Sequence, residues 1–343
     1  MKSKRIALLS FSCCLVFLSS CAGTSEGSSL SSSSSENEEA PLSILSPAGA
    51  PTLALYNHFD DENFLTTKEA SQVALAMKTS TNKDALIFDG VNGLKFLKGK
   101  QTTASWKLAR WLTGGNFYVV STKHEKSEEF NPDSKILSFG NGLLPDKVFK
   151  KLAKEEWGWS LDEENIKYEA GTSQVSAILG SENFASYDYY FIAEPSLQAA
   201  KANLTNLNQA ASVHEIFNLR EEWRSYSGME YIPQAALFVN EESYQEKKNS
   251  FKRLLDEVDT NLADAVHTPS KIVSYLSEKE PDLDKQAAKL GYKAPLINAL
   301  QKNGNNRFGI IEPGKVSDNR SFVNDFMEKI GESVSFEETF FVS

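Results

Sequence analysis

The chain contains the stretch Lys135-Ile-Leu-Ser-Phe-Gly-Asn-Gly-Leu-Leu-Pro-Asp-Lys-Val-Phe149, which passes from a short apolar run through a glycine-rich turn into a helical pattern. The apolar run is rich in residues that favour strands, and Gly140 and Gly142 suit a sharp turn. Beyond the turn, Val148 and Leu152 are spaced i,i+4, as on one face of a helix. The stretch therefore predicts a strand, a tight turn and a helix in succession.

The same alternation recurs along the chain from about residue 41. Further short apolar runs predict strands at 42–45, 85–88, 117–120, 189–192 and 235–239. Further helices are expected from Pro51, since the missing N–H of proline costs nothing in a first helical turn, and over 196–202 and 241–258. Strands that alternate with helices predict an α/β fold with mostly parallel sheets.

The first 21 residues carry the features of a secretory signal. Lys2, Lys4 and Arg5 precede an apolar run of roughly 13 residues, which is shorter than the about 20 that span a bilayer. The run ends in Leu18-Ser-Ser-Cys21, which resembles a bacterial lipobox. The resemblance implies that residues 1–20 are a lipoprotein signal peptide and that Cys21 carries lipid such as palmitate on the extracytoplasmic face of the cell membrane. A plain cleaved signal or a buried amphipathic helix is the alternative.

Residues 21–40 are rich in serine and acidic side chains, so they bury too little apolar surface to fold and are predicted to be a flexible tether. The formal net charge is -10, and the first 21 residues carry three positive and no negative charges, so the mature chain stands near -13. A nucleic-acid partner is not expected, because phosphate chains require a basic face. All three cysteines, Cys13, Cys14 and Cys21, leave with the signal or carry the lipid. No thiol then remains for a disulfide, a metal site or a nucleophile.

Three predicted strand-to-helix turns, at 46–52, 139–146 and 192–196, are rich in Gly, Ser, Asn and Pro. In open α/β sheets, ligands bind beyond the carboxyl ends of strands. Glycine lets the backbone approach a ligand, and the free N–H groups of a first helical turn accept an anion. Binding loops and merely tight structural turns are both consistent with this pattern.

Four sequence blocks, at 46–56, 85–99, 138–149 and 192–195, occur along the chain in the same order as in a known family. Together they resemble the type II periplasmic binding proteins of the nitrate, sulfonate, taurine and thiamine-precursor group, which are the solute receptors of ABC importers. The resemblance runs from about residue 41 to 336. It implies a two-lobed fold in which each lobe is a mostly parallel sheet flanked by helices and the lobes close on a ligand. Lobe I would comprise 41–121 and 237–343, lobe II 122–236, and the crossovers would lie near 120–122 and 235–236.

The resemblance also implies a site made by loops 46–52, 89–92, 113–117, 140–143, 171–173 and 194–195. Backbone N–H groups at 49–52 and 141–143 would hold an anionic group, and Tyr56 or Phe117 would stack on a ring. No Arg or Lys lies in these motifs, and Arg110 is expected to be solvated or on a lobe face. An oxyanion and an uncharged or heteroaromatic ligand therefore both stay open. The ligand-binding candidates are Ser46, Gly49, Ala50, Pro51, Thr52, Asn92, Asn116, Asn141, Gly142, Thr172 and Glu194.

No complete catalytic or metal motif is present. The segment 93–100 has one residue too many for a phosphate loop, with Gln101 where Ser or Thr would bind Mg²⁺. Pro145 replaces the third glycine of a dinucleotide fingerprint, and the segment 124–128 lacks the second histidine of a zinc helix. We therefore expect no enzyme, no cofactor and no metal, but a monomeric receptor that delivers a small organic or anionic ligand to ABC permease subunits. A surface enzyme or ligand sensor built on the same fold is the alternative.

Overall fold

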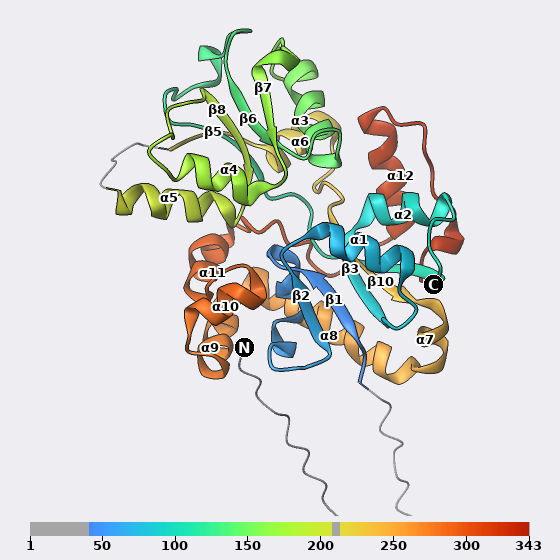
Figure 1. Cartoon of the computed structure of the whole chain (residues 1–343). Coiled ribbons are helices and arrows are strands. Elements are labelled where there is room, and N and C mark those ends of the chain that lie inside the picture. The colour runs from blue at the N-terminus through green and yellow to red at the C-terminus, as the bar shows by residue number, and fades with distance from the viewer. Residues whose placement is uncertain (1–40, 208–212, 343) are drawn as a thin grey trace, which may run out of the picture. The chain divides into compact units, whose positions relative to one another are not determined.

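The computed structural model describes residues 41–207 and 213–342 (Figure 1). The expected signal peptide, the tether and the lipid-bearing Cys21 lie outside these residues. None of the helices in the described ranges combines the length and the apolar character that a membrane span requires.

Two five-stranded sheets organise the described chain (Figure 1). The first has the strand order β2-β1-β3-β10-β4, and the second has the order β7-β6-β8-β5-β9. In the first sheet β1 is parallel to β2 and β3, and β10 is antiparallel to both its neighbours. In the second sheet β6 is parallel to β7 and β8, and β5 is antiparallel to both its neighbours. The strands are β1 (Ile44–Pro47), β2 (Phe64–Thr67), β3 (Ala85–Asp89), β4 (Trp106–Trp111), β5 (Phe117–Ser121), β6 (Ile136–Phe139), β7 (Ile166–Glu169), β8 (Tyr189–Ala193), β9 (His214–Asn218) and β10 (Ala235–Asn240).

The α/β class predicted from the sequence is confirmed. The sheets are mixed because β5 and β10, the first strands after each passage between the sheets, enter antiparallel to their neighbours. All six strands predicted from apolar runs are interior strands of the two sheets. The four strands without a prediction, β2, β4, β7 and β9, are the four sheet edges.

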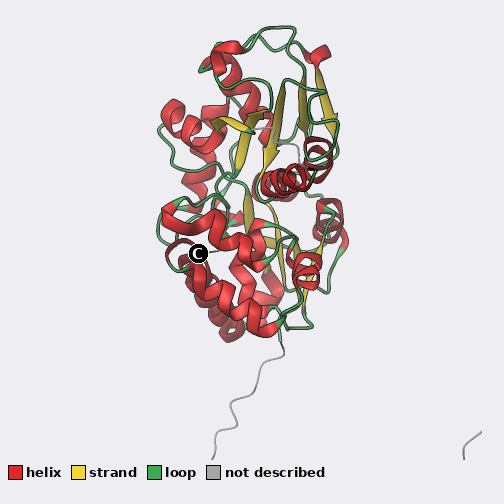
Figure 2. Cartoon of the chain, turned by 90° about the vertical axis from the view of Figure 1, so that its left-hand side faces the viewer, coloured by secondary structure: helices red, strands yellow, loops and turns green. Residues whose placement is uncertain are grey.

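Helices flank both sheets (Figure 2). A large part of the core lies between these helices and the strands, and one continuous apolar cluster includes residues of both sheets, such as Phe238 and Phe191. The helices that accompany the first sheet are η1 (Ala50–His58), α1 (Ala70–Thr79), α2 (Gly90–Lys98), α7 (Glu241–Glu246), α8 (Lys248–His267), α9 (Pro269–Lys279), α10 (Leu283–Leu290), α11 (Ala294–Gln301), η4 (Lys302–Gly304), α12 (Asn319–Ile330) and η5 (Glu338–Phe340). Those that accompany the second are η2 (Ser127–Glu129), α3 (Leu144–Glu155), η3 (Glu163–Asn165), α4 (Thr172–Leu179), α5 (Ser196–Asn206) and α6 (Leu219–Ser227).

Two predicted helices differ in form from the expectation. The segment that starts near Pro51 is a 3₁₀ helix, η1, with Leu55 outside the helical region of backbone conformation. The helix expected over 241–258 is interrupted at Lys247, whose φ of -114° and ψ of 44° separate α7 from α8. The Lys247 ammonium lies 3.0 Å from a carboxylate oxygen of Asp84, so this interruption is fixed to the start of β3.

The C-terminal helix α12 contacts elements on both sides. Phe322 packs edge-on against Trp111 of β4, with ring centroids 5.5 Å apart. Phe326 lies 5.1 Å from the ring of Trp223 on α6. Because β4 belongs to the first sheet and α6 accompanies the second, α12 joins the apolar layers of the two.

The chain passes between the sheets at 112–116 and again at 228–234, and the segment 306–311 packs against the first passage. Gly114 donates its N–H to the Gly309 carbonyl at 2.6 Å and accepts at its own carbonyl from Ile232 at 3.0 Å. A Cβ on Gly309 would lie 2.1 Å from the carbonyl oxygen of Gly115, so the backbones approach as closely as glycine permits. We call these three segments the hinge cluster. Strand β5, which the expected boundary placed in lobe I, pairs within the second sheet, so the first crossover lies before Phe117 and not near 120–122.

Candidate ligand-binding site

The loop after β3 of the first sheet and the loop after β8 of the second sheet both contact the hinge cluster. After β3, Gly90 donates its N–H to the Gln234 carbonyl at 2.8 Å, and after β8, Glu194 donates its N–H to the Asn116 carbonyl at 2.9 Å. Asn92 of α2 and Gly142, just before α3, line one small cavity of about 20 Å³. Loops 46–52, 89–92, 113–117, 140–143, 171–173 and 194–195 are called the strand-end loops below.

The first strand-end loop, 46–52, is held against the end of α10. Gly49, whose φ of 124° lies in the region that favours glycine, donates its N–H to the Leu290 carbonyl at 2.6 Å. The Thr52 hydroxyl lies 2.8 Å from the Gly49 carbonyl and 3.0 Å from the Tyr292 hydroxyl. The polar groups of Gly49 and Thr52 are therefore committed within the fold. The remaining candidates here are the buried Ser46 and Ala50 and the half-buried Pro51.

Asp89 ends β3 and caps α2. One carboxylate oxygen accepts the Asn92 N–H at 2.9 Å, and the other accepts the Asn92 side-chain amide at 3.0 Å. Burial raises the pKa of Asp89 to about 6, because the charged form is poorly solvated. In the part of the chain that the structure describes, Asp89 forms no ion pair. A carboxylate has about four acceptor positions, so Asp89 retains capacity to accept further hydrogen bonds.

The carboxylate of Asp146 binds the loop before α3. Gly140 and Gly142 both have positive φ, and Gly142 donates its N–H to Asp146 at 2.9 Å. Asp146 is buried; its other oxygen accepts from the Tyr168 hydroxyl at 3.0 Å, and the Lys150 ammonium lies 3.3 Å away. A residue of α3 itself therefore occupies the place at this turn that an anionic ligand would take.

Two candidates of the second sheet remain open to solvent. Asn141 is exposed and forms no hydrogen bond with any residue that the structure describes, and its neighbour Leu143 is 49% exposed. Thr172 begins α4, and its hydroxyl lies 2.9 Å from that of Ser196, which begins α5. The N-cap of α4, Gly171, provides no side-chain cap, so the first turn of α4 carries no carboxylate.

Glu194 is buried at the end of β8, and Arg307 neutralises it. One carboxylate oxygen of Glu194 accepts from Arg307 Nε at 3.0 Å and Nη2 at 2.8 Å, while the other accepts the Gln198 N–H at 3.2 Å. Burial raises the pKa of Glu194, and the Arg307 charge opposes that shift. Arg307 also lies 2.8 Å from Glu215 and 4.3 Å from the ring centre of Tyr118. The guanidinium of Arg307 is therefore shared between two carboxylates.

Asn116 is the last residue of the first passage and is 4% exposed. Its side-chain amide donates to the Glu194 carbonyl, and its side-chain carbonyl accepts from Gln234 at 3.1 Å. Both ends of this amide are thus used to position the end of β8 against the hinge cluster.

Solved structures of other proteins share the fold of this chain. An ABC transporter protein from Parabacteroides distasonis matches with a TM-score of 0.61 and 13% identity, over 89% of this chain and 99% of its own. The ligand-binding component of an ABC-type import system from Staphylococcus aureus, solved with zinc bound, matches with a TM-score of 0.59 and 10% identity, over 85% and 91%. The periplasmic aliphatic sulphonate-binding protein SsuA from Escherichia coli matches with a TM-score of 0.55 and 10% identity, over 88% and 92%.

The chain has the periplasmic-binding-protein fold. The two-lobed architecture that the sequence blocks implied is thereby confirmed at the level of the fold. No protein-family model and no curated protein sequence matches the chain.

Tyr56 and Phe117 do not lie where they could stack on a ligand ring, although the family resemblance implied that they would. Tyr56, expected to stack on a ligand ring, is buried, and its ring meets that of Tyr275 edge-on at 5.4 Å. Phe117 is 2% exposed and packs against Phe139 and Phe191 in the core of the second sheet. The stacking interpretation was wrong for both, because η1 directs Tyr56 towards α9 and the alternation of β5 directs Phe117 inward. Arg110 pairs with Asp259 of α8 at 3.1 Å, in agreement with a lobe-face role.

Three charged residues of the site, Asp89, Asp146 and Arg307, were not among the ligand-binding candidates named from the sequence. Asp89 and Asp146 stand inside the quoted sequence blocks, and their spacing to the following helix is the available signal, since an acidic residue in the first turn favours a helix N-terminus. Arg307 lies 113 residues from Glu194, and no local pattern connects the two.

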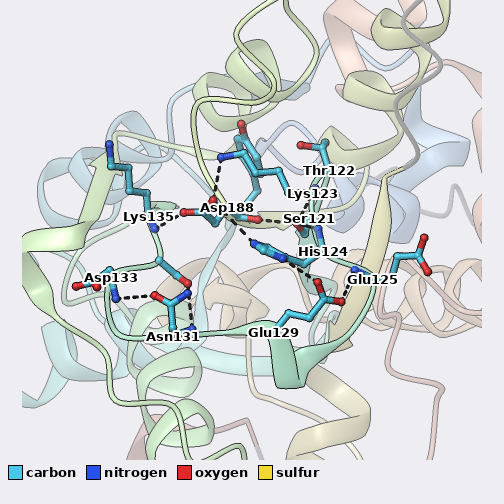
Figure 3. Close-up of polar contacts among 12 residues, drawn as sticks. Ser121, Thr122, Lys123, His124, Glu125, Glu129, Asn131, Asp133, Lys135 and Asp188 are labelled. Atoms are coloured by element: carbon cyan, nitrogen blue, oxygen red, sulfur yellow. Dashed lines mark hydrogen bonds and ion pairs between the residues drawn. The ribbon is translucent and has the colours of Figure 1, made fainter.

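A separate polar cluster lies at the amino-terminal end of β8 (Figure 3). Asp188, just before β8, accepts the Lys135 N–H at 2.8 Å and pairs with the Lys123 ammonium at 2.8 Å. His124 lies 3.0 Å from Glu129 and stacks on the Tyr189 ring at a centroid distance of 5.2 Å. These contacts fix the loop between β5 and β6. Among the described residues, no group of three or more His, Cys, Asp or Glu side chains is arranged to hold a metal ion.

Two larger surface cavities lie on the helices of the first sheet, away from the strand-end loops. One of about 640 Å³ is formed by residues around the α8–α9 junction and the end of α11. The other, about 510 Å³, is formed by Tyr56, Tyr275 and the outer face of α8. The convergence of loops from both sheets favours the strand-end loops as the site, although both cavities are larger than the one between Asn92 and Gly142.

Proposed function

We propose that the protein is an extracytoplasmic solute-binding receptor that delivers a small organic ligand to the permease subunits of an ABC importer. One observation carries this proposal: the loop after β3 of the first sheet and the loop after β8 of the second sheet both contact the hinge cluster. The similarity over 99% of the Parabacteroides ABC transporter protein supports it. We further propose that the protein acts as a monomer and without an enzymatic step.

Closure of the two lobes about the hinge cluster would enclose the ligand. Each lobe consists of one sheet and its flanking helices, so the strand-end loops of the first sheet would approach those of the second. Few backbone segments pass between the sheets, which suits a hinge in which a small number of residues absorb the change in dihedral angles.

A lipid on Cys21 would hold this receptor at the membrane, with residues 21–40 as its tether. Fractionation of cells that produce a Cys21→Ser chain tests this part alone. We expect the variant to be released into the soluble extracytoplasmic fraction with its fold unchanged. A Cys21→Ser chain that remained in the membrane fraction would contradict the anchor.

Asn141→Ala tests the binding function. Asn141 is exposed in a strand-end loop and forms no hydrogen bond with the described residues, so its loss should leave the free energy of unfolding within about 0.5 kcal/mol of the wild type. If Asn141 contacts the ligand, affinity for the small molecule that co-purifies with the chain should fall about tenfold or more. Mass spectrometry identifies the molecule, and calorimetry with both chains measures the affinity.

Asn183→Ala is the matched control. Asn183 is also exposed, but it precedes β8 and so lies at the end of that strand opposite the strand-end loops. Equal affinities of the two variants would argue against the site. A wild-type chain that carries no small molecule, responds to no compound in a thermal-shift screen and shows no compaction by X-ray scattering would refute the receptor function.

A further inference from the structure

We propose that Asp89, Asp146 and Glu194 determine the ligand specificity of the strand-end loops, excluding oxyanions and favouring a ligand that is uncharged or positively charged. This inference rests on the proposed receptor function and names the chemical class of its ligand. The proposed specificity would distinguish the ligand of this chain from those of proteins with the same fold that are named as sulfonate-binding and nitrate-binding proteins.

At three of the helices that begin at the strand-end loops, one backbone N–H that could bind an oxyanion is already paired with a carboxylate. A helix N-terminus attracts anions through its free N–H groups and its dipole. In α2 the Asn92 N–H is bound by Asp89, and in the turn before α3 the Gly142 N–H is bound by Asp146. In the first turn of α5 the Gln198 N–H is bound by Glu194. Three helices that begin at the strand-end loops thus carry their own carboxylate.

The cations around these carboxylates are also engaged. Arg307 divides its donors between Glu194 and Glu215. Lys150 lies 3.3 Å from Asp146 and 2.8 Å from Glu163. An arriving oxyanion would have to displace a carboxylate from one of these cations, and would meet a like charge in doing so.

The two lysines that line the small cavity between Asn92 and Gly142 are engaged as well. Lys95 of α2 and Lys147 of α3 both pair with Glu332, which follows α12. Glu332, from a third element, therefore offsets one of the two positive charges that α2 and α3 bring to this part of the site.

The strand-end loops do offer side-chain oxygens that can accept hydrogen bonds from a ligand. Asp89 has acceptor positions beyond those that Asn92 occupies, and no ion pair within the described residues. The hydroxyls of Thr172 and Ser196 lie 2.9 Å apart at the starts of α4 and α5, and the Asn141 amide is exposed. This set suits a ligand with N–H or O–H donors. The net charge near -13 of the mature chain would also attract a cation more readily than an anion.

The experiment measures anion binding with sodium nitrate and sodium methanesulfonate as probes, by calorimetry on the purified full chain. The wild type should bind neither probe at millimolar concentration. Asp146→Asn removes the negative charge beside the Gly142 N–H and should tighten the binding of both probes at least about tenfold. Asp89→Asn is the second variant, and it should fold well because asparagine caps helices as effectively as aspartate.

Asp282→Asn is the charge-matched control. Asp282 caps α10, which follows a helix rather than a strand, so its loss should leave probe binding unchanged. Submillimolar binding of methanesulfonate or nitrate by the wild type would overturn the specificity while leaving the receptor function intact. Failure of both cap variants to gain anion affinity, or an equal gain in Asp282→Asn, would also overturn it. Mass spectrometry of the co-purifying ligand is independent: a phosphate, sulfonate or carboxylate compound would contradict the inference, and absence of any ligand would instead count against the receptor function.

Discussion

Asp89 links the chemistry of the site to the stability of the fold. Its carboxyl has a pKa of about 6 in the folded chain, raised by burial from the usual value of 3.8. Between these two pH values the folded state binds more protons than the unfolded state. The free energy of unfolding therefore falls as the pH rises from about 4 to 6, by about 1.4 kcal/mol for each unit of pKa difference.

Asp89→Asn should remove this dependence. The variant keeps the cap on α2 but has no group to titrate, so its stability relative to the wild type should increase by about 3 kcal/mol between pH 4 and pH 7. Urea unfolding at several pH values measures the difference. Asp282→Asn, at an exposed cap far from β3, provides the control. Parallel pH profiles for Asp89→Asn and the wild type would show that the carboxyl is solvated rather than buried.

At the residue scale, the sequence located the strand-end loops but not what their side chains contact. Thr52 was expected to line the site because the family resemblance placed it in a ligand loop. Its hydroxyl instead meets Tyr292, 240 residues further along the chain. Glu194 was expected at the site from the same resemblance, and its partner Arg307 comes from the segment after α11. Partners this remote leave no local pattern, so the charge state of a site can differ from what its own loops indicate.

At the scale of secondary-structure elements, the sequence predicted the buried interior strands and missed the edge strands. Interior strands such as β8 are buried throughout, so their apolar runs are unbroken. Edge strands such as β7 and β9 are only partly covered, and charged or polar residues interrupt their few apolar residues. A four- or five-residue segment of this kind lacks the periodicity that separates a strand from a loop. Pairing with a neighbour, which is a tertiary contact, makes these segments strands.

Helix α12 has a role that its amphipathic sequence alone does not reveal. Phe322 and Phe326 lie one turn apart on the same face of the helix, and they pack onto Trp111 and Trp223 respectively. Its C-terminal neighbour Glu332 pairs with lysines of both α2 and α3. The helix therefore acts as a strut between the layers of the two sheets.

Phe326→Ala tests the strut. The phenyl ring is fully buried, so its removal should lower the free energy of unfolding by about 3–5 kcal/mol and shift the fluorescence of Trp223. Phe340→Ala, which truncates a half-buried ring of η5, should cost about 1–2 kcal/mol. Urea unfolding followed by fluorescence and circular dichroism measures both variants. A loss no larger for Phe326→Ala than for Phe340→Ala would mean that α12 contributes little to joining the layers.

At the scale of the whole molecule, the hinge cluster sets how the two sheets are connected. Asn116 and Gln234, one from each passage, are hydrogen-bonded to each other, and Asn116 also holds the end of β8. The third segment, 306–311, brings Gly309 against the first passage and Arg307 against Glu194. A change in this third segment should therefore affect both the stability and the relative motion of the two lobes.

Gly309→Ala isolates that contact, and Gly314→Ala is its control. Both glycines have positive φ, 65° and 81°, so alanine costs about 1–2 kcal/mol of backbone strain at either position. A Cβ at Gly314 would meet nothing within 4 Å, whereas at Gly309 it would lie 2.1 Å from the Gly115 carbonyl oxygen. We therefore expect Gly314→Ala to lose about 1 kcal/mol and Gly309→Ala at least about 3 kcal/mol in urea unfolding, because backbone atoms must move. X-ray scattering of Gly309→Ala should also show a changed radius of gyration, since the shifted atoms join the two sheets. Equal losses from the two variants, with unchanged scattering, would place the hinge elsewhere.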